Sequence, residues 1–414
     1  MRNLIGFEFK KIVLRPVTLV AFVGFLLAFV FLTTVYTLYT EELVQIYEPD
    51  LPMNEWNDTV GMNAVAKRKE WTNALSGTWT SESLKQMVNE YRFAMSDPKN
   101  TTGELNEEAM HWRGEMQRFD GWSAEEIQSF KEKNPIHIYK PEFLFGESNK
   151  WLPAEFIIRE LDGIPLDSLP TVEQAFPGLK GDAVFGWHDG PLKTAKNLID
   201  RIGLFQALLI MLALSPIFAE EKTLRTDAIQ LSAKYGRSKL IGAKLIASIL
   251  FSVLSLAVFF ALDVLINGLI YGFEGWGLPV QLEYLTMSVP YGLTFGGYVG
   301  FSLLCIFVGT LCLSTMQVLI SAWMKSSFSS ILMGASVFFG CLILHGLVPL
   351  DGRKYVAVLP PMLFIPDGYF ESLVDFNFGF IMPSLPIMTG IAAAICFALS
   401  IILCVYKSRR QMVN

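Results

Sequence analysis

The amino-acid sequence predicts an all-α polytopic membrane protein with six transmembrane helices, both termini in the cytoplasm and a mainly helical extracytoplasmic domain. Three observations predict this fold class. Hydrophobic residues make up 52% of the chain, and one long polar segment, residues 40–197, separates the first apolar segment from the next. Six apolar segments are each long enough to cross a bilayer. Because a bilayer offers no water to unpaired backbone groups, each of these segments is expected to be a helix.

The chain begins with a segment, residues 1–16, that interleaves apolar and charged side chains. Phe7 and Phe9 stand beside Lys10 and Lys11, a pattern that favours an amphipathic helix in contact with membrane lipid at the inner face. A basic flank without helical structure is the alternative. Pro16 is expected to end this helix. The first transmembrane helix follows over residues 17–39, and it is expected to stay uncleaved because no small-residue cleavage site follows it.

The polar insertion, residues 40–197, is expected to form an extracytoplasmic domain with its own core. It holds 27 Asp and Glu against 16 Lys and Arg, and no cysteine, so no disulfide framework is available. Candidate helices cover Ser81–Met95 and Glu104–Phe119, and a further one starts at Ser123. His111 and Glu115 share a helix face, which we interpret as a solvated acidic face. No metal site and no catalytic residue is assigned, because the known zinc and nucleophile signatures are missing.

The rest of the chain, residues 198–414, supplies the other five spans, predicted at 198–219, 240–270, 291–313, 329–350 and 385–406. Lysines and arginines gather before the first span, in the loop 220–239 and after the last span, whereas the loops 271–290 and 351–384 carry only Arg353 and Lys354. The positive-inside rule therefore places both termini and the loop 220–239 in the cytoplasm. All five cysteines lie in apolar segments and are expected to act as small hydrophobic residues.

Three features of the spans suggest specific roles. Gly292, Gly296 and Gly300 recur every four residues, which predicts a close helix–helix interface, either within the chain or with a second subunit. Asp263 and His345 are ionisable residues near the outer ends of their spans, and both are candidates for a transport pathway, with simple hydration as the alternative. The proline-rich loop 351–384 contains apolar pieces too short to span, which suggests re-entrant or interfacial segments.

The loop 220–239 is charged on one side and apolar at positions such as Leu224 and Ile229, a pattern expected of a surface helix that offers one face to a partner. In this loop the chain resembles permease subunits of type-2 ABC exporters. The matching positions are Glu221, Thr226, Leu231, Ser232, Arg237, Gly242 and Lys244. The resemblance covers the six spans and this loop but not the insertion. It departs from the family pattern at Arg225, where glycine is usual, and in lacking a proline after Ser232.

The resemblance implies a coupling helix around Glu221–Lys234 that docks on a separate ATP-binding cassette ATPase. The residues expected to couple to that ATPase are Glu220, Glu221, Thr226, Leu231, Ser232 and Arg237. The chain lacks the phosphate-binding Gly-x-x-x-x-Gly-Lys-Ser/Thr sequence, so we expect no cofactor in this chain and place ATP and Mg²⁺ on the partner. A charge reversal, Glu221→Lys, is expected to uncouple ATP hydrolysis from transport without unfolding the protein.

The resemblance further implies a second permease, as a homodimer or heterodimer, and a peptide-like, antibiotic or amphipathic substrate. The insertion without cysteine suggests a bacterial cell membrane as the location. A membrane sensor or assembly protein that binds a ligand or partner through the insertion is the alternative, although six spans exceed what an anchor needs. A polytopic membrane enzyme is a third interpretation, but only Asp263 and His345 offer polar chemistry near the membrane. Nucleic acid is not an expected partner, because no basic stripe is long enough to follow phosphates.

Overall fold

The computed structural model describes residues 1–46, 57–86 except 75, 88, isolated positions between 169 and 182, and then 183–226, 239–283, 289, 291–370, 376 and 384–410. The chain divides into two compact units. Unit 1 combines Met1–Thr33, Leu192–Gly268 and Gly297–Asn414, and unit 2 combines Thr34–Pro191 with Leu269–Gly296. The sequence predicted the long insertion, but it did not predict that the loop after the third span belongs to the same unit.

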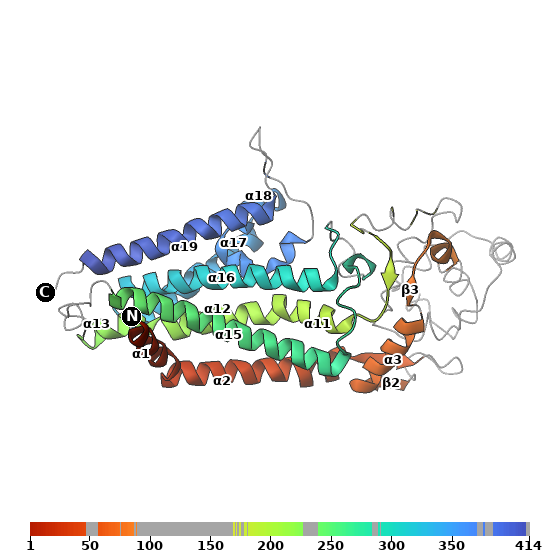
Figure 1. Cartoon of the computed structure of the whole chain (residues 1–414), viewed down its shortest axis with the longest axis horizontal. Helices are drawn as coiled ribbons and strands as arrows, with labels where there is room; N and C mark the ends of the chain where they lie inside the picture. The colour runs from red at the N-terminus through yellow and green to blue at the C-terminus, as the bar shows by residue number, and fades with distance from the viewer. Residues whose placement is uncertain are drawn as a thin grey trace. The chain divides into compact units, whose positions relative to one another are not determined.

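Among the described residues, six helical segments are long and apolar enough to cross a membrane, which confirms the predicted fold class. The first is α2 (Pro16–Phe31) continued by the π-helix η1 (Leu32–Glu41), and the third and fourth are α15 (Lys239–Tyr271) and α16 (Phe295–Trp323). The fifth and sixth are α17 (Ser327–Leu347) and α19 (Leu385–Arg410). The short helix α1 (Arg2–Val13) and the end of α19 lie at the same end of unit 1 (Figure 1).

The second span differs most from its prediction, because it extends over Asp189–Thr223 instead of 198–219. It consists of α11 (Asp189–Asn197), the π-helix η4 (Leu198–Ile202), α12 (Gly203–Leu214) and α13 (Pro216–Thr223). Pro216 supplies no backbone N–H and so separates α12 from α13. The sequence-based limits were too narrow because the polar residues at both ends of this segment are buried against protein instead of exposed to water.

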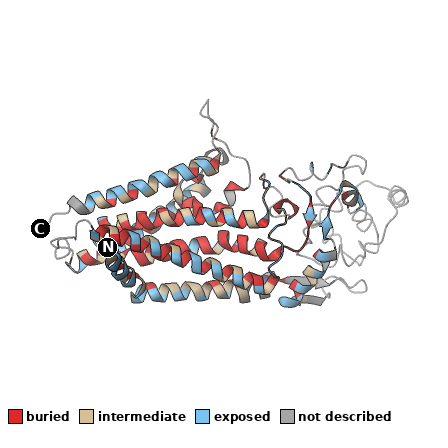
Figure 2. Cartoon of the chain, viewed as in Figure 1, coloured by how far each residue is buried: buried red, intermediate tan, exposed pale blue. Residues whose placement is uncertain are grey.

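The second span is also the central helix of unit 1. In its most apolar window 67% of the residues are buried, against 17% for the first and fifth spans. Figure 2 shows the buried residues along α12 and the exposed ones along α2 and α19. Phe205 of α12 stacks on Phe25 of α2, with 5.6 Å between ring centroids, and Phe29 meets Phe259 of α15 edge to face at 5.9 Å. Such aromatic pairs fix how the first three spans pack.

The loop between the fifth and sixth spans returns into the bundle. Its pieces are α18 (Leu350–Ala357), the 3₁₀ helix η7 (Pro360–Phe364) and η8 (Pro366–Tyr369). A Cβ atom on Gly203 would lie 2.2 Å from the carbonyl oxygen of Phe364, and one on Gly309 would lie 3.0 Å from its ring. Both glycines stand near the middle of their spans, so the predicted re-entrant character of this loop agrees with the packing of η7.

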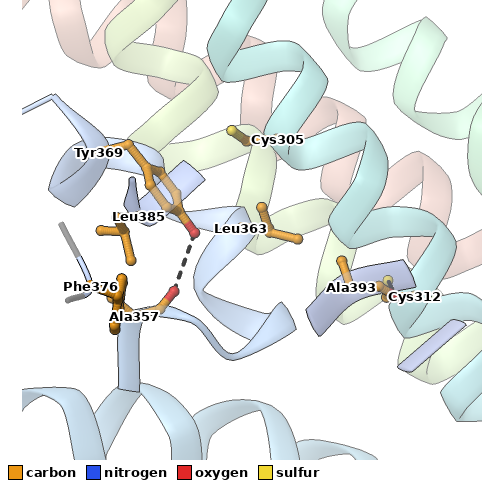
Figure 3. Close-up of a cluster of buried hydrophobic side chains, with 8 residues drawn as sticks. All are labelled: Cys305, Cys312, Ala357, Leu363, Tyr369, Phe376, Leu385 and Ala393. Atoms are coloured by element: carbon orange, nitrogen blue, oxygen red, sulfur yellow. Dashed lines mark hydrogen bonds between the residues drawn. The ribbon is translucent and has the colours of Figure 1, made fainter. Parts of the chain in front are cut away.

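The re-entrant loop covers a buried apolar cluster shown in Figure 3. Tyr369 lies at its edge, and its hydroxyl donates a hydrogen bond of 3.3 Å to the carbonyl oxygen of Ala357. Cys305 and Cys312 of α16 are members of the cluster, and both are buried and unpaired by disulfides. These two cysteines therefore act as small hydrophobic residues, as the sequence predicted.

Unit 2 contains strands that the sequence analysis missed. β1 (Leu43–Ile46) pairs antiparallel with β2 (Asn57–Val60), and β3 (Gly77–Thr78) pairs with β4 (Val184–Phe185). Unit 2 also contains the helix α3 (Met62–Ala74). The candidate helices at Glu104–Phe119 and after Ser123, with His111 and Glu115, lie outside the described residues, as does most of Ser81–Met95. The two small β-ladders are thus an addition to the expectation of a mainly helical domain.

The loop after the third span packs into unit 2 beside the segment that leads into α11. Trp187 donates a hydrogen bond of 2.6 Å to the carbonyl oxygen of Tyr271, and Lys69 of α3 pairs with Glu274. Gly275 has φ +87°, and a Cβ atom there would lie 2.4 Å from the carbonyl oxygen of Trp187. Only glycine fits this position, because both the backbone conformation and the close approach exclude a side chain.

Candidate functional site

The strongest candidate site lies where α1, α13 and α15 meet in unit 1. Glu221, near the end of α13, is 5% exposed and has lysines on both carboxylate oxygens. Lys11 of α1 lies 2.8 Å from its Oε1, and Lys244 of α15 lies 2.5 Å from its Oε2. One buried carboxylate therefore joins three helices from separate parts of the chain. We refer to this site as the Glu221 cluster, made of Glu8, Lys11, Arg15, Glu220, Glu221 and Lys244.

Lys244 is the most buried charge of the Glu221 cluster, with no exposed side-chain surface. Its Nζ also donates a hydrogen bond of 2.9 Å to the carbonyl oxygen of Ile217 and lies 4.5 Å from the centroid of the Phe218 ring. A buried ammonium group is stable only when charges and hydrogen bonds replace its water. The groups that replace water around Lys244 belong to α13, so this lysine fixes the start of α15 against that helix.

The α1 side of the Glu221 cluster holds two further charged residues. Arg15, between α1 and α2, forms an ion pair of 2.8 Å with Glu220, whose side chain is 40% exposed. Glu8 is 3% exposed and faces Lys244 and Lys11. Burial raises the pKa of Glu8 above its usual range, although both lysines act in the opposite direction. Three acidic and three basic side chains thus gather in one place, so the cluster has no formal net charge.

The other side of α13 is joined to the end of α16. Lys222 donates hydrogen bonds to the carbonyl oxygens of Ala322 and Met324, the latter at 3.1 Å, and so places its positive charge at the C-terminus of α16. The Ser321 hydroxyl accepts from the backbone N–H groups of Phe218 and Ala219 at 3.0 and 3.1 Å. α13 is therefore held to α1, α15 and α16 at once.

The structure changes the predicted start of the coupling helix. Glu220 and Glu221 belong to the last turn of the second span, and α13 ends at Thr223. Arg225 follows with φ +55°, a conformation that terminates a helix. The hydroxyl of Thr226 donates to the carbonyl oxygen of Glu221 at 3.3 Å. The expectation of a continuous helix from Glu221 onward is therefore wrong at its N-terminal end, and the remaining coupling candidates, Leu231, Ser232 and Arg237, lie outside the described residues.

A second polar cluster lies within the spans, around Asp263 of α15. Its Oδ1 accepts hydrogen bonds of 2.8 Å from the side chains of both Asn197 and Asn267. Asn197 also accepts from Arg201 at 2.9 Å, so the arginine reaches the carboxylate through an amide. Asp263 is completely buried, and its Oδ2 has no hydrogen-bond partner in the described part of the chain. We refer to Thr194, Asn197, Arg201, Asp263 and Asn267 as the Asp263 cluster.

The other pathway candidate, His345, lies in the last turn of α17 and does not belong to the Asp263 cluster. A histidine at that position is favoured by the partial negative charge of the helix C-terminus. Sequence reasoning placed both residues near the outer ends of their spans, as pathway candidates with hydration as the alternative. Burial without water contact was not predicted, because the asparagines that solvate the carboxylate come partly from a different span.

Among the described residues neither Gly296 nor Gly300 packs closely against another helix of this chain, and an interface with a second subunit stays a prediction. Gly292 precedes α16, and a Cβ atom on Gly296 would lie 3.1 Å from the carbonyl oxygen of Trp276, which belongs to a loop. Gly300 is exposed with no atom within 4 Å of its Cβ position, and it borders an apolar cavity of about 370 Å³ between α15 and α16. The helix α16 starts at Phe295, later than predicted, so Gly292 lies outside it.

Unit 2 holds a charged network of its own. Arg68 of α3 pairs with Glu42 at 2.9 Å and with Asp189, and Glu42 also accepts from the Tyr271 hydroxyl at 3.0 Å. His188 is 2% exposed, with Nε2 2.9 Å from Glu283 Oε2 and Nδ1 2.5 Å from the carbonyl oxygen of Gly186. Two acceptors on the two ring nitrogens favour the doubly protonated ring.

The surroundings of His188 support that protonation state. Burial lowers the pKa of His188, but the hydrogen bond to Glu283 and the charges of Glu283 and Asp189 outweigh it, so the pKa lies above its ordinary value. Its ring also stacks on Phe295, with 4.6 Å between centroids. Across the described residues, no three His, Cys, Asp or Glu side chains gather in the way a metal site requires.

Sequence reasoning found Glu220 and Glu221 but not their partners on α1. The signal was present, because Glu8, Lys11 and Arg15 recur at intervals of three and four residues and so share one face of a helix. Lys244 also carried a signal, as a lysine five residues inside an apolar segment. Such a charge needs a partner from another helix.

Comparison with known proteins gives one family. The family model described as ABC-2 family transporter protein matches residues 2–361, which include unit 2, most of unit 1 and the first five spans. No curated protein is similar to the chain at the level searched. No solved structure is similar at that level either.

Proposed function

Because the chain belongs to the ABC-2 family of transporter proteins, we propose that it is the permease of an ATP-driven exporter. Family membership makes it a multi-pass membrane subunit of an ABC transporter and not the catalytic subunit. In a bacterium such a protein lies in the cell membrane. The outward direction of transport, the substrate and the mode of coupling are the proposed parts.

A separate ATPase subunit, implied by the family, supplies the energy in this proposal. The chain contains no phosphate-binding Gly-x-x-x-x-Gly-Lys-Ser/Thr sequence, so ATP and Mg²⁺ are assigned to that partner. A second permease, either another copy of this chain or a related one, completes the pathway. Unit 2 would then serve as the outer part of the transporter.

The observation that carries the proposal is the position of α13. This helix leads directly into the basic connection 224–238, and it is joined by buried ion pairs and hydrogen bonds to α1, α15 and α16. A displacement of the connection therefore cannot remain local. We propose that a movement of the ATPase against Glu220–Arg237 is passed by α13 to three neighbouring helices.

An amphipathic substrate, whether a lipid-like compound, an antibiotic or a peptide, fits the membrane part best. The cavity beside Gly300 supports this substrate class, because its lining is apolar throughout. The lining residues are Val253, Leu256, Ala257, Phe260, Gly300, Leu303, Leu304 and Phe307. The Asp263 cluster supplies a polar counterpart within the same span.

The test is co-purification. The tagged chain is expressed from its native operon, purified in mild detergent, and its partners are identified by mass spectrometry. A stoichiometric ATPase with the phosphate-binding sequence, lost when residues 224–238 are replaced by a Gly-Ser linker, is the expected result. A preparation without any ATPase would contradict the exporter and favour a sensor or assembly protein that acts through unit 2.

A further inference from the structure

The short helix α1 contributes residues to the Glu221 cluster, so its contacts are not limited to the membrane surface. Lys11 reaches Glu221 across 210 positions of the sequence, with 2.8 Å between Nζ and Oε1. Ile12 in the same turn is 1% exposed, and Glu8 one turn earlier is 3% exposed. This face of α1 is therefore part of the protein interior.

The opposite face of α1 carries no such contacts. Lys10 is exposed and makes no ion pair in the described part of the chain, and Phe7 and Leu14 are 64% and 66% exposed. Lys10 and Lys11 are adjacent in sequence and identical in chemistry, yet only one of them is bound to α13. Substitution of Lys10 is therefore a matched control for substitution of Lys11.

The geometry of Glu221 makes the three helices dependent on one another. One carboxylate oxygen of Glu221 pairs with Lys11 of α1, and the other pairs with Lys244 of α15. If either lysine moved away, the buried carboxylate would lose one of its two ion pairs. Lys244 cannot turn outward to water, because its side chain is completely buried. Breaking one pair of such a set is costly because the remaining charge stays buried without compensation.

We propose that α1, α13 and the start of α15 form one coupling unit, in which Lys11 is a positioning residue that holds α1 to the helix leading into the ATPase-facing connection. This inference rests on the proposed function. In it, α1 takes part in transmitting the force of ATP hydrolysis to the first span, which follows directly after Arg15. The Arg15–Glu220 ion pair provides a second and more exposed link between the same elements.

The experiment compares Lys11→Met with Lys10→Met in the complex purified with its co-expressed ATPase. The readouts are the amount of ATPase retained, the rate of ATP hydrolysis relative to the ATPase alone, and the thermal stability of the complex. We expect Lys11→Met to retain the ATPase but to lower the permease-dependent rate by about fivefold, the lower end of the usual range of coupling between sites. Lys10→Met is expected to leave the rate unchanged, and Lys11→Arg to restore it.

A double-mutant cycle with Glu221→Gln shows whether the effect passes through this ion pair. Once Glu221 has lost its charge, Lys11→Met is expected to cause little further change. An unchanged rate in Lys11→Met, an equal loss in Lys10→Met, or a full additional loss in the Glu221→Gln background would each overturn the proposal. Absence of any ATPase from the wild-type complex would instead refute the proposed function, and the coupling unit with it.

Discussion

Glu221 and Asp263 are both buried carboxylates in unit 1, yet they are neutralised in different ways. Glu221 has a lysine on each oxygen, at 2.8 and 2.5 Å. Asp263 receives two amide hydrogen bonds on one oxygen and has no hydrogen-bond partner for the other among the described residues. The first site compensates a charge with charges, and the second site solvates a carboxyl group with dipoles.

This difference predicts how the stability of each site depends on the charge of its carboxylate. At the Glu221 cluster the charge itself is the bond between helices, so removal of the charge should loosen them. At the Asp263 cluster the hydrogen-bond acceptor matters more than the charge, since no cation among the described residues forms an ion pair with the carboxylate. A change of carboxylate to amide should therefore destabilise the protein strongly at Glu221 and only slightly at Asp263.

The largest expected effect is that of Glu221→Gln. It removes the carboxylate that forms an ion pair with the completely buried Lys244, and loss of one member of a buried pair costs about 3–5 kcal/mol. The measurement is the thermal-unfolding midpoint in mild detergent, monitored by the loss of monodisperse protein on heating. The expectation of uncoupling without unfolding for Glu221→Lys is revised for the same reason, because a third lysine would enter a buried site.

Asp263→Asn is the matching control, since the amide oxygen can still accept from Asn197 and Asn267, and we expect a much smaller shift than for Glu221→Gln. Asp263→Ala removes the acceptor as well and leaves two buried amide donors unsatisfied, a cost of about 1–3 kcal/mol. Equal midpoints for the asparagine and alanine variants would show that the two hydrogen bonds do not hold these helices together.

A smaller effect is expected at His188 in unit 2, where the cation is titratable. Because its pKa is raised in the folded protein, its stabilising contribution is complete below about pH 6.5, the ordinary value for histidine. The contribution decreases as the pH rises above that value and is lost once folded His188 has released its proton. Thermal unfolding from about pH 6 to pH 9 should therefore show a decline that His188→Gln lacks. Parallel profiles for the two proteins would mean that His188 stays neutral.

The smallest expected effect is that of Glu220→Gln, next to Glu221 in sequence. Glu220 is 40% exposed and pairs with Arg15, and exposed pairs contribute about 0–1 kcal/mol. The unfolding midpoint should barely change, and any effect on stability should vanish at high salt. A loss as large as that of Glu221→Gln would show that the Glu221 cluster acts as one network and that exposure is a poor guide within it.

The spans could be predicted from the sequence because hydrophobic length alone determines them. The limits of the second span could not, since Asn197 and Glu221 are polar residues that the fold buries by pairing them with distant side chains. Lys11 and Glu221 are separated by 210 positions, and no periodicity links them. The face shared by Glu8, Lys11 and Arg15 was visible in the sequence, but only the structure supplies the carboxylate that it meets.

The candidate site shows the same limit. Glu220 and Glu221 were found through a resemblance that treated them as parts of an exposed loop, whereas Glu221 is a buried bridge. The spacing of Gly292 and Gly296 would place them on one helix face only if a single helix covered both, and α16 begins at Phe295. Local sequence patterns thus predicted where helices form. The ends of the second span depend on ion pairs and hydrogen bonds with residues far away in the sequence, which local patterns do not show.

The re-entrant segment η7 has a consequence for how the protein assembles in the membrane. Its residues Pro360–Phe364 follow α17 but pack against Gly203 of α12 and Gly309 of α16, which leave the ribosome earlier. Irregular backbone is tolerated at membrane depth only where protein surrounds it. We therefore expect the segment to take its place only after the earlier spans have come together, as a late step in the assembly of the bundle.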